Sequence, residues 1–190
     1  MGFIPTIIER NANIEHAYDI YSCLLKERII LCTGELNDEL AASIIAQLIY
    51  LASQSKEEIT MYINSPGGHI SSGLAILDTM NLIHCDIKTI GMGLCASMAS
   101  ILLMCGTKGK RLISENCEVM IHQPLGQVSG QARDMEINTH HILDLQKKLY
   151  TLMSQQTGQS LNQIKKDCDR DHYLTAVQSI QYGIVDEIIH

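Results

Sequence analysis

The hydroxyl of Ser97 stands in the segment LCASMAS (residues 94–100), among small and apolar residues. A strand-like run precedes the segment and a helix-like run follows it, so Ser97 falls at the expected start of a helix. A serine there is a good N-cap, because its oxygen accepts from an amide that has no partner within the helix. It is also well placed to attack a carbonyl carbon, since the Met98 amide would stabilise the resulting oxyanion. The segment differs from the G-x-S-x-G turn of hydrolases.

A second set of backbone amides is expected in NSPGGHISSG (residues 64–73). Gly67 and Gly68 allow the backbone to come close to a ligand, and Pro66 stiffens the entry to the turn. The Gly68 amide is a candidate second oxyanion donor, because sites in α/β proteins gather at the carboxyl ends of strands. A tight turn between a strand and a helix would use the same residues.

A serine nucleophile needs a base and an acid that orients that base. His122 is the best-placed histidine, because it ends an apolar strand and a rigid proline turn follows it; a hydrogen-bonded structural histidine is the alternative. His69, after the glycine pair, is a weaker candidate. The segment KKDCDRDHYL (165–174) supplies three possible acids, and spacing alone does not choose among them: Asp167, Asp169 and Asp171.

Composition and charge narrow the class of protein. The net charge is −7 and no basic stripe occurs, which argues against a nucleic-acid partner. Seven cysteines with no C-x-x-C pair indicate reduced thiols and a cytoplasmic location. No signal peptide is expected, and the uncharged run 89–107 fits a buried strand and helix better than a membrane span. Glu136 and His140 would make only half a metal site, so we expect no metal and a solvated helix face.

The residues that must position this chemistry alternate between strand-like and helix-like runs, as expected for one α/β domain over residues 1–190 with a largely parallel, covered sheet. Strands are expected at 28–32, 59–64, 87–92, 110–113 and 118–122, and the first helices at 38–53, 71–82 and 97–105. The stretch GLCA (93–96) is interpreted as a turn.

The second half of the chain is expected to be helical. Residues 131–157 form one long helix in this interpretation, with Gly158 as its stop. The segments SLNQ (160–163) and TAVQ (175–178) match the capping box that opens a helix. A helix as long as 131–157 suggests contact with a neighbouring subunit.

Taken together, these stretches resemble the ClpP family of self-compartmentalised serine peptidases over nearly the whole chain. The matching segments are AYDIYSCLLKERII, YINSPGG, GMGLCASMAS, TKGKR, VMIHQPLG, GQARDMEI, TGQSLNQI and RDHYLTAVQSIQYGIVDEI. Their common order and spacing make a chance match very unlikely.

The resemblance implies a crotonase-like fold and assigns roles at matching positions. Ser97 would be the nucleophile, His122 the base and Asp171 the orienting acid. Gly68 and Met98 would form the oxyanion hole, and Leu125 and Gly126 would begin the segment that pairs with an extended substrate. Arg170 would contact the neighbouring subunit in a ring.

The resemblance also implies an assembly and a partner. Residues 131–157 would be a protruding handle helix, and residues 1–16 a mobile N-terminal axial segment. Seven subunits would form a ring, and two rings would stack into a tetradecamer that takes in peptides and, with an AAA+ unfoldase such as ClpX or ClpC, unfolded proteins. The chain has no P-loop, so ATP would be used by the partner and no cofactor is expected here. The pocket expected to receive the ATPase loop contains Leu48, Tyr62, Leu82, Ile90, Met92, Leu112 and Ile189.

Three departures from the family pattern indicate a divergent paralogue, which suggests a possible second ClpP paralogue in a mixed complex. The ATPase pocket is mostly aliphatic, Gln127 replaces a usual glycine, and Cys23 replaces a usual arginine. Two alternatives to a working peptidase follow: a structural subunit of a mixed ring, or a crotonase-type acyl-CoA enzyme. The latter would share the two-amide oxyanion hole without needing a nucleophilic serine.

Overall fold

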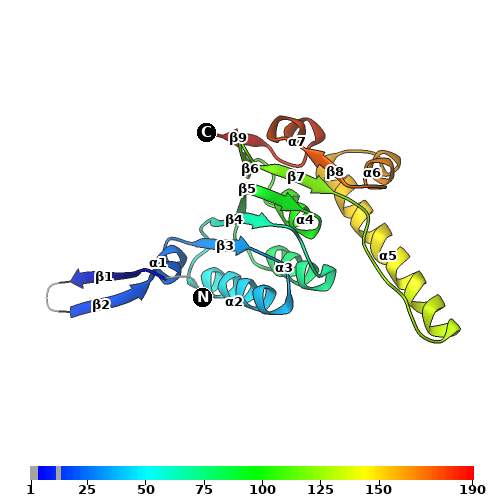
Figure 1. The fold of residues 1–190 in the computed structure, drawn as a ribbon. Helices are drawn as coiled ribbons and strands as arrows, with labels where there is room; N and C mark the ends of the chain where they lie inside the picture. Colours follow the sequence, from blue (N-terminus) through cyan, green and yellow to red (C-terminus); the bar gives the residue numbers. More distant parts are fainter. Residues whose placement is uncertain (1–3, 12–13) are drawn as a thin grey trace.

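The computed structural model describes residues 4–11 and 14–190, and it contains a mixed α/β architecture (Figure 1). The strands are β1 (Thr6–Asn11), β2 (Ile14–Asp19), β3 (Ile29–Thr33), β4 (Ile59–Ser65), β5 (Ile87–Ala96), β6 (Arg111–Ser114), β7 (Glu118–Ile121), β8 (His172–Leu174) and β9 (Glu187–Ile189). The helices are α1 (Ile20–Lys26), α2 (Asp38–Gln54), α3 (Ile70–Leu82), α4 (Met98–Met104), α5 (Ala132–Thr157), α6 (Leu161–Asp167) and α7 (Ala176–Tyr182).

The main sheet is largely parallel, as the alternating pattern predicts. Strands β3, β4, β5, β6 and β9 lie side by side in that order, and β7 pairs with the far part of β5. Only the β7–β8 pair in this sheet is antiparallel. The crotonase-like class expected from the family resemblance is consistent with this arrangement.

Strand β5 changes partners halfway along its length. Its residues 89–91 pair with β6, and its residues 94–96 pair with β7. Between them Gly93 has a φ of 62°, and the side-chain oxygen of Asn64 accepts from the Leu94 amide. The prediction that GLCA forms a turn was therefore wrong, because the strand resumes beyond Gly93 by pairing with a new neighbour. This continuation carries β5 up to Ser97.

The sheet is covered by helices on one face where β3 and β4 lie. Side chains alternate along both strands, so that Ile30, Met61 and Ile63 are fully buried while Leu31 and Tyr62 are only half-buried. The buried set packs against α2, α3 and α4 in one continuous hydrophobic cluster. The expectation of a covered sheet is thus incorrect for this face of a single chain, because Leu31 and Tyr62 stay half-buried and line an apolar groove there.

Helix α5 projects away from the sheet, as Figure 1 shows. Only Leu149, Tyr150 and Met153 of its 26 residues are buried, and all three lie near its C-terminal end. Gly158 ends the helix in the left-handed conformation, as predicted. The expected long helix is present, and most of its residues before Leu149 are exposed.

The caps of the last two helices differ from each other. At α7, Thr175 and Gln178 form the reciprocal capping box that the sequence predicts. At α6, Ser160 accepts from the Gln163 amide, but the Gln163 side chain binds Asp167 instead of returning to the cap. The capping box at α6 is therefore only half formed, because the Gln163 side chain turns toward Asp167 and away from the Ser160 amide.

The N-terminal part of the chain contains regular structure that the sequence analysis did not predict. Strands β1 and β2 form an antiparallel hairpin, and Asp19 caps α1 through the Ser22 amide. Part of the segment 1–16, which was expected to be mobile, therefore belongs to this hairpin. Residues 1–3 and 12–13 of that segment lie outside the described residues. Among the helices that the structure describes, none is long and apolar enough to cross a membrane.

A buried arginine joins the C-terminal elements to the sheet. Arg111, only 5% exposed, makes a two-pronged ion pair with Asp186 and donates to the carbonyls of Met104, Gln156 and Gly183. Burial alone would raise the pKa of Asp186, but hydrogen bonds and the charge of Arg111 outweigh it and lower that pKa. The pair therefore stabilises the fold above the ordinary pKa of an aspartate, and this contribution is lost as the pH falls through the lowered value.

We predict that Arg111→Ala lowers the free energy of unfolding by about 3–5 kcal/mol, because it leaves a carboxylate and three carbonyls without their donor. Urea denaturation at fixed protein concentration measures this loss. The matched control is Arg133→Ala, which removes an exposed ion pair to Glu136 and should cost no more than about 0.5 kcal/mol. Equal losses in the two variants would contradict the assignment.

Candidate active site

Ser97 occupies a strained turn between β5 and α4. Its φ is 53° and its ψ is −122°, a conformation that costs a non-glycine residue of order 1–3 kcal/mol. The Ser97 amide donates to the Met120 carbonyl on β7 at 2.8 Å, and its carbonyl accepts from the Ser100 amide and hydroxyl. These bonds hold the backbone in place while the side chain remains free to point away from the helix.

The Ser97 hydroxyl does not cap α4. The residue stands at the N-cap position, but its side chain makes no capping hydrogen bond. Instead its Oγ lies 2.8 Å from Nε2 of His122. Although the sequence lacks the G-x-S-x-G glycines, the backbone makes the same kind of strained strand-to-helix turn. The capping interpretation is therefore wrong for this serine.

His122 and Asp171 complete a chain of hydrogen-bonding groups. Nδ1 of His122 lies 3.0 Å from Oδ1 of Asp171, so the imidazole stands between the carboxylate and the Ser97 hydroxyl. The His122 side chain is 13% exposed, whereas that of Asp171 is 60% exposed. The imidazole is thus largely shielded from water, while the acid faces solvent in the isolated chain.

The other two candidate acids have different partners. Asp167 accepts from the Tyr182 hydroxyl and from the Gln163 amide nitrogen, which ties α6 to α7. The backbone carbonyl of Asp169 accepts from the Gln123 side chain, one residue beyond His122. Tertiary structure therefore selects Asp171, because β8 places it beside the end of β7.

The glycine loop after β4 packs directly against the Ser97 turn. A Cβ atom on Gly67, whose φ is 91°, would lie 2.7 Å from the Ala96 carbonyl oxygen and 3.0 Å from the Met98 nitrogen. A Cβ atom on Gly68 would lie 2.2 Å from the Leu36 carbonyl oxygen. Glycine is required at both positions, because any side chain would push the loop away from the Met98 amide.

Two amides are available beside the hydroxyl. Within the described part of the chain, neither the Gly68 nor the Met98 amide donates to another backbone group. Both residues line the same pocket as Ser97 and His122. An oxyanion formed at Ser97 therefore has two candidate donors, as the sequence predicts.

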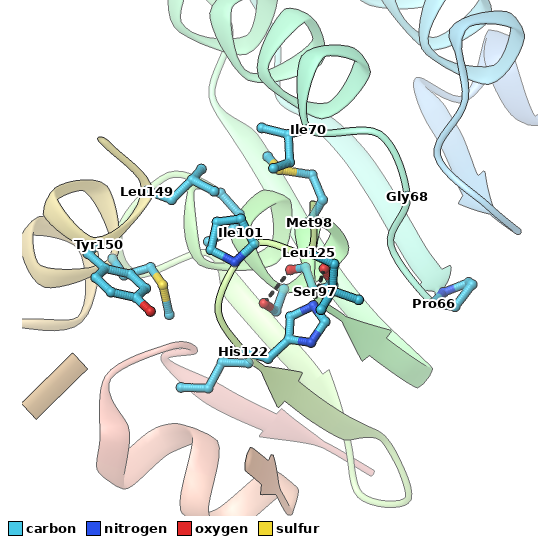
Figure 2. Close-up of a pocket in the computed structure, with 14 residues that line it drawn as sticks. Pro66, Gly68, Ile70, Ser97, Met98, Ile101, His122, Leu125, Leu149 and Tyr150 are labelled. Atoms are coloured by element: carbon cyan, nitrogen blue, oxygen red, sulfur yellow. Dashed lines mark hydrogen bonds between the residues drawn. The ribbon is translucent and has the colours of Figure 1, made fainter. Parts of the chain in front are cut away.

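The pocket beside Ser97 has a volume of about 230 Å³ (Figure 2). The lining comes from the loop after β4, from α3 and α4, from the end of β7 and the residues after it, and from the C-terminal part of α5. The lining residues are Pro66, Gly68, Ile70, Ser97, Met98, Ser100, Ile101, Ile121, His122, Pro124, Leu125, Leu149, Tyr150 and Met153. None of them carries a full charge apart from a protonated His122, so the pocket favours an apolar group.

The segment after His122 is extended and open on one side. Leu125 is 81% exposed and lines the pocket. Gly126 packs closely on Ile142 of α5: a Cβ atom added to Gly126 would lie 2.6 Å from Cδ1 of Ile142. Gln127, which follows, is exposed. The predicted substrate-pairing residues thus lie next to the pocket and against the handle helix.

Other sequence candidates lie outside this site. His69 is the N-cap residue of α3 but makes no side-chain capping bond, and it does not line the pocket. Glu136 pairs with Arg133 on the exposed face of α5, and no cluster of three metal-ligating side chains occurs among the described residues. The side chain of Arg170 is 90% exposed.

The sequence analysis missed the α5 contribution to the pocket. Leu149, Tyr150 and Met153 are the buried residues of that helix and form one wall. Leu149 is one of the apolar residues that recur at helical spacing in 131–157, but that spacing does not reveal which element they face. A second missed residue is Gly73 of α3, where a Cβ would lie 2.2 Å from Cγ of Met98.

The groove expected to receive an ATPase loop is only partly as predicted. Tyr62 and Met92 do line an apolar groove of about 340 Å³ on the open face of the sheet. Leu48 and Ile90 are buried in the chain and offer no surface there, so these two were assigned wrongly. The remaining lining residues, which the sequence analysis did not name, are Leu24, Ile29, Leu31, Thr33, Ile63 and Asn64.

A parallel α/β sheet that brings a strained serine, a histidine, an aspartate and two backbone amides to one edge defines a hydrolase-type site. Comparison with known proteins gives the family. The model of the Clp protease family matches residues 11–190. The chain is also 50% identical over all of its 190 residues to an ATP-dependent Clp protease proteolytic subunit of Ligilactobacillus salivarius (strain UCC118), covering 96% of that protein. This chain belongs to the Clp protease family, and it is a peptidase subunit of that family.

We predict that Gly67→Ala lowers kcat/KM for peptide hydrolysis by about 10²–10³-fold, as loss of an oxyanion donor does, because the added methyl group displaces the loop from Met98. Steady-state kinetics with a fluorogenic peptide measure the change. Gly109→Ala is the matched control, since Gly109 has a similar φ of 81° but open space around its Cα. That variant bears the same backbone strain and should keep its activity. Similar losses in both would contradict the proposed close approach.

Proposed function

We propose that the chain is a serine endopeptidase that works through an acyl-enzyme on Ser97. The observation that supports this best is the placement of one imidazole between two partners, 2.8 Å from the Ser97 hydroxyl and 3.0 Å from the Asp171 carboxylate. Such an arrangement lets a neutral histidine accept the serine proton while the aspartate holds its ring and tautomer.

In the first half of the reaction, Ser97 Oγ attacks the carbonyl carbon of the peptide bond and Nε2 of His122 takes the hydroxyl proton. The negative oxygen formed in this step accepts from the Gly68 and Met98 amides. When the tetrahedral species collapses, the C–N bond breaks and His122 gives its proton to the departing amine. The product is an ester between Ser97 and the acyl half of the substrate.

Water then hydrolyses the ester. His122 takes a proton from the water molecule while the water oxygen attacks the ester carbon. His122 then gives that proton to Ser97 Oγ as the ester bond breaks. The free acid leaves and the serine is restored. Throughout, Asp171 stays ionised and stabilises the imidazolium form of His122.

The extended segment at Leu125 and Gly126 is suited to pair with a substrate backbone. An added strand is recognised mainly through main-chain hydrogen bonds, so this mode tolerates many sequences. Because the backbone of Gly126 packs against Ile142, the handle helix supports this segment. Broad specificity for extended peptides follows.

Assembly and partners are proposed from the family. Clp proteases are oligomeric rings that work with Clp ATPases, and the relative from Ligilactobacillus salivarius carries the name ATP-dependent Clp protease proteolytic subunit. We propose stacked heptameric rings joined through α5, with Arg170 at a ring contact. The apolar groove at Tyr62 and Met92 is the proposed docking place for an AAA+ unfoldase such as ClpX or ClpC.

Cofactor use and location are also proposed. The chemistry above needs no metal or cofactor in this chain, so ATP would be used only by the partner ATPase. All seven cysteines are free thiols; the Cys117 thiol donates a hydrogen bond to the Cys95 sulfur at 4.0 Å, and the two form no disulfide. Free thiols are typical of a reducing compartment, which supports a cytoplasmic location.

We predict that a fluorophosphonate labels Ser97 in the assembled protein, and that Ser97→Ala abolishes both labelling and peptide hydrolysis, because the probe needs an activated hydroxyl. Intact mass and peptide mapping identify the labelled residue. Ser160→Ala is the matched control, since Ser160 is an N-cap serine that does cap its helix. It should lose about 0.5–2 kcal/mol of stability and keep its labelling.

Two results would overturn this proposal. Absence of labelling in a correctly sized assembly would leave the chain a structural subunit of a mixed ring. Binding and turnover of an acyl-CoA thioester by Ser97→Ala would instead indicate crotonase-type chemistry, which uses the paired amides without the serine.

A further inference from the structure

The wall of the pocket contributed by α5 differs chemically from the other walls. Ile70, Met98 and Ile101 on α3 and α4 are flexible or branched aliphatic side chains that adapt to a ligand. Tyr150 on α5 is the one aromatic side chain that lines the pocket, and it brings the only phenolic hydroxyl. Figure 2 shows its ring projecting from α5 toward the pocket.

Tyr150 is held firmly where it stands. It is buried to all but 4% of its surface, and its neighbours Leu149 and Met153 on the same helix are also buried. One turn before Tyr150 on α5, the Gln146 side chain donates to the Gln123 side chain at 3.4 Å, next to His122. Burial raises the pKa of Tyr150, so the hydroxyl stays neutral. A fixed, neutral ring with few rotatable bonds makes a wall that does not yield to a larger ligand.

The pocket opens beside the atoms that would react. It is lined by Ser97, His122 and Gly68 at one side and by the α5 residues at another. A substrate laid along residues 125–126 would place into this pocket a side chain next to the bond that Ser97 attacks. The volume of about 230 Å³ limits how large that side chain is.

We propose that Tyr150 is the residue that sets the size of the side chain accepted on the acyl side of the cleaved bond. Its ring closes the α5 end of the pocket, so that medium-sized aliphatic side chains such as leucine fit and bulky aromatic ones do not. This inference rests on the proposed function, because it takes Ser97 to be the nucleophile. It adds a specificity-determining position outside the Ser97–His122–Asp171 triad.

The test compares the assembled wild-type chain with Tyr150→Ala on two fluorogenic peptides that differ only in carrying leucine or phenylalanine before the cleaved bond. We expect the ratio of kcat/KM for phenylalanine over leucine to rise at least about tenfold in Tyr150→Ala, the scale on which a hydrophobic pocket discriminates size. Tyr150→Phe keeps the ring and should keep the wild-type ratio.

Further variants separate a specific effect from a general loss of packing. Leu152→Ala removes a half-buried α5 side chain that does not line this pocket and should leave the ratio unchanged. If Tyr150→Ala does not assemble, Tyr150→Leu takes its place, because leucine keeps an apolar side chain and a good helix former at this position. In Tyr150→Leu the ratio of kcat/KM for phenylalanine over leucine should also rise, but by a smaller factor than in Tyr150→Ala.

Fluorophosphonate labelling of Ser97 runs alongside every variant and distinguishes two failures. If wild-type chain neither labels nor cleaves, the proposed function fails and the inference falls with it. If labelling and cleavage persist but neither Tyr150→Ala nor Tyr150→Leu changes the ratio, the peptidase stands and the role of Tyr150 is refuted. A ratio that changes equally in Leu152→Ala also refutes it.

Discussion

The left-handed backbone of Ser97 is the constraint on which the site depends. A positive φ at the junction of β5 and α4 turns the serine side chain away from its own helix and toward His122. The conformation is unfavourable, and the surrounding structure holds it: Met120 accepts the Ser97 amide proton, and Ser100 donates twice to its carbonyl. Gly67 leaves just enough room for this turn, so the loop after β4 and the turn after β5 determine each other.

The sheet explains why the reacting groups converge. Parallel strands place their carboxyl ends along one edge, and β4, β5 and β7 end in the glycine loop, Ser97 and His122 respectively. The break at Gly93 is essential to this arrangement, because it lets β5 leave β6 and pair with β7. Strand β8 then runs antiparallel to β7 and brings Asp171 to His122. Strand pairing brings these groups together, and among them Ser97 carries the strained positive φ.

Helix α5 serves two regions of the molecule at once. Its buried C-terminal end forms a wall of the pocket and receives a hydrogen bond from Arg111 at Gln156, while its outer part supports the Gly126 segment and extends beyond the sheet. Movement of this helix would therefore alter both the pocket and the substrate-pairing segment. A protein that assembles through α5 has its assembly and its active site joined by one rigid element.

The sequence by itself determined most of the regular elements, the parallel sheet, and the serine, histidine and paired glycines as candidates, because hydrophobic periodicity and glycine-rich turns are local signals. Spacing did not choose among Asp167, Asp169 and Asp171. The family resemblance indicated Asp171, and the pairing of β8 with β7 brings that residue next to His122. Only the tertiary structure decided that Ser97 binds His122 instead of capping α4, that β5 continues past Gly93, and that Tyr150 lines the pocket. These outcomes depend on contacts between residues far apart in the chain, and a local pattern carries no record of such contacts.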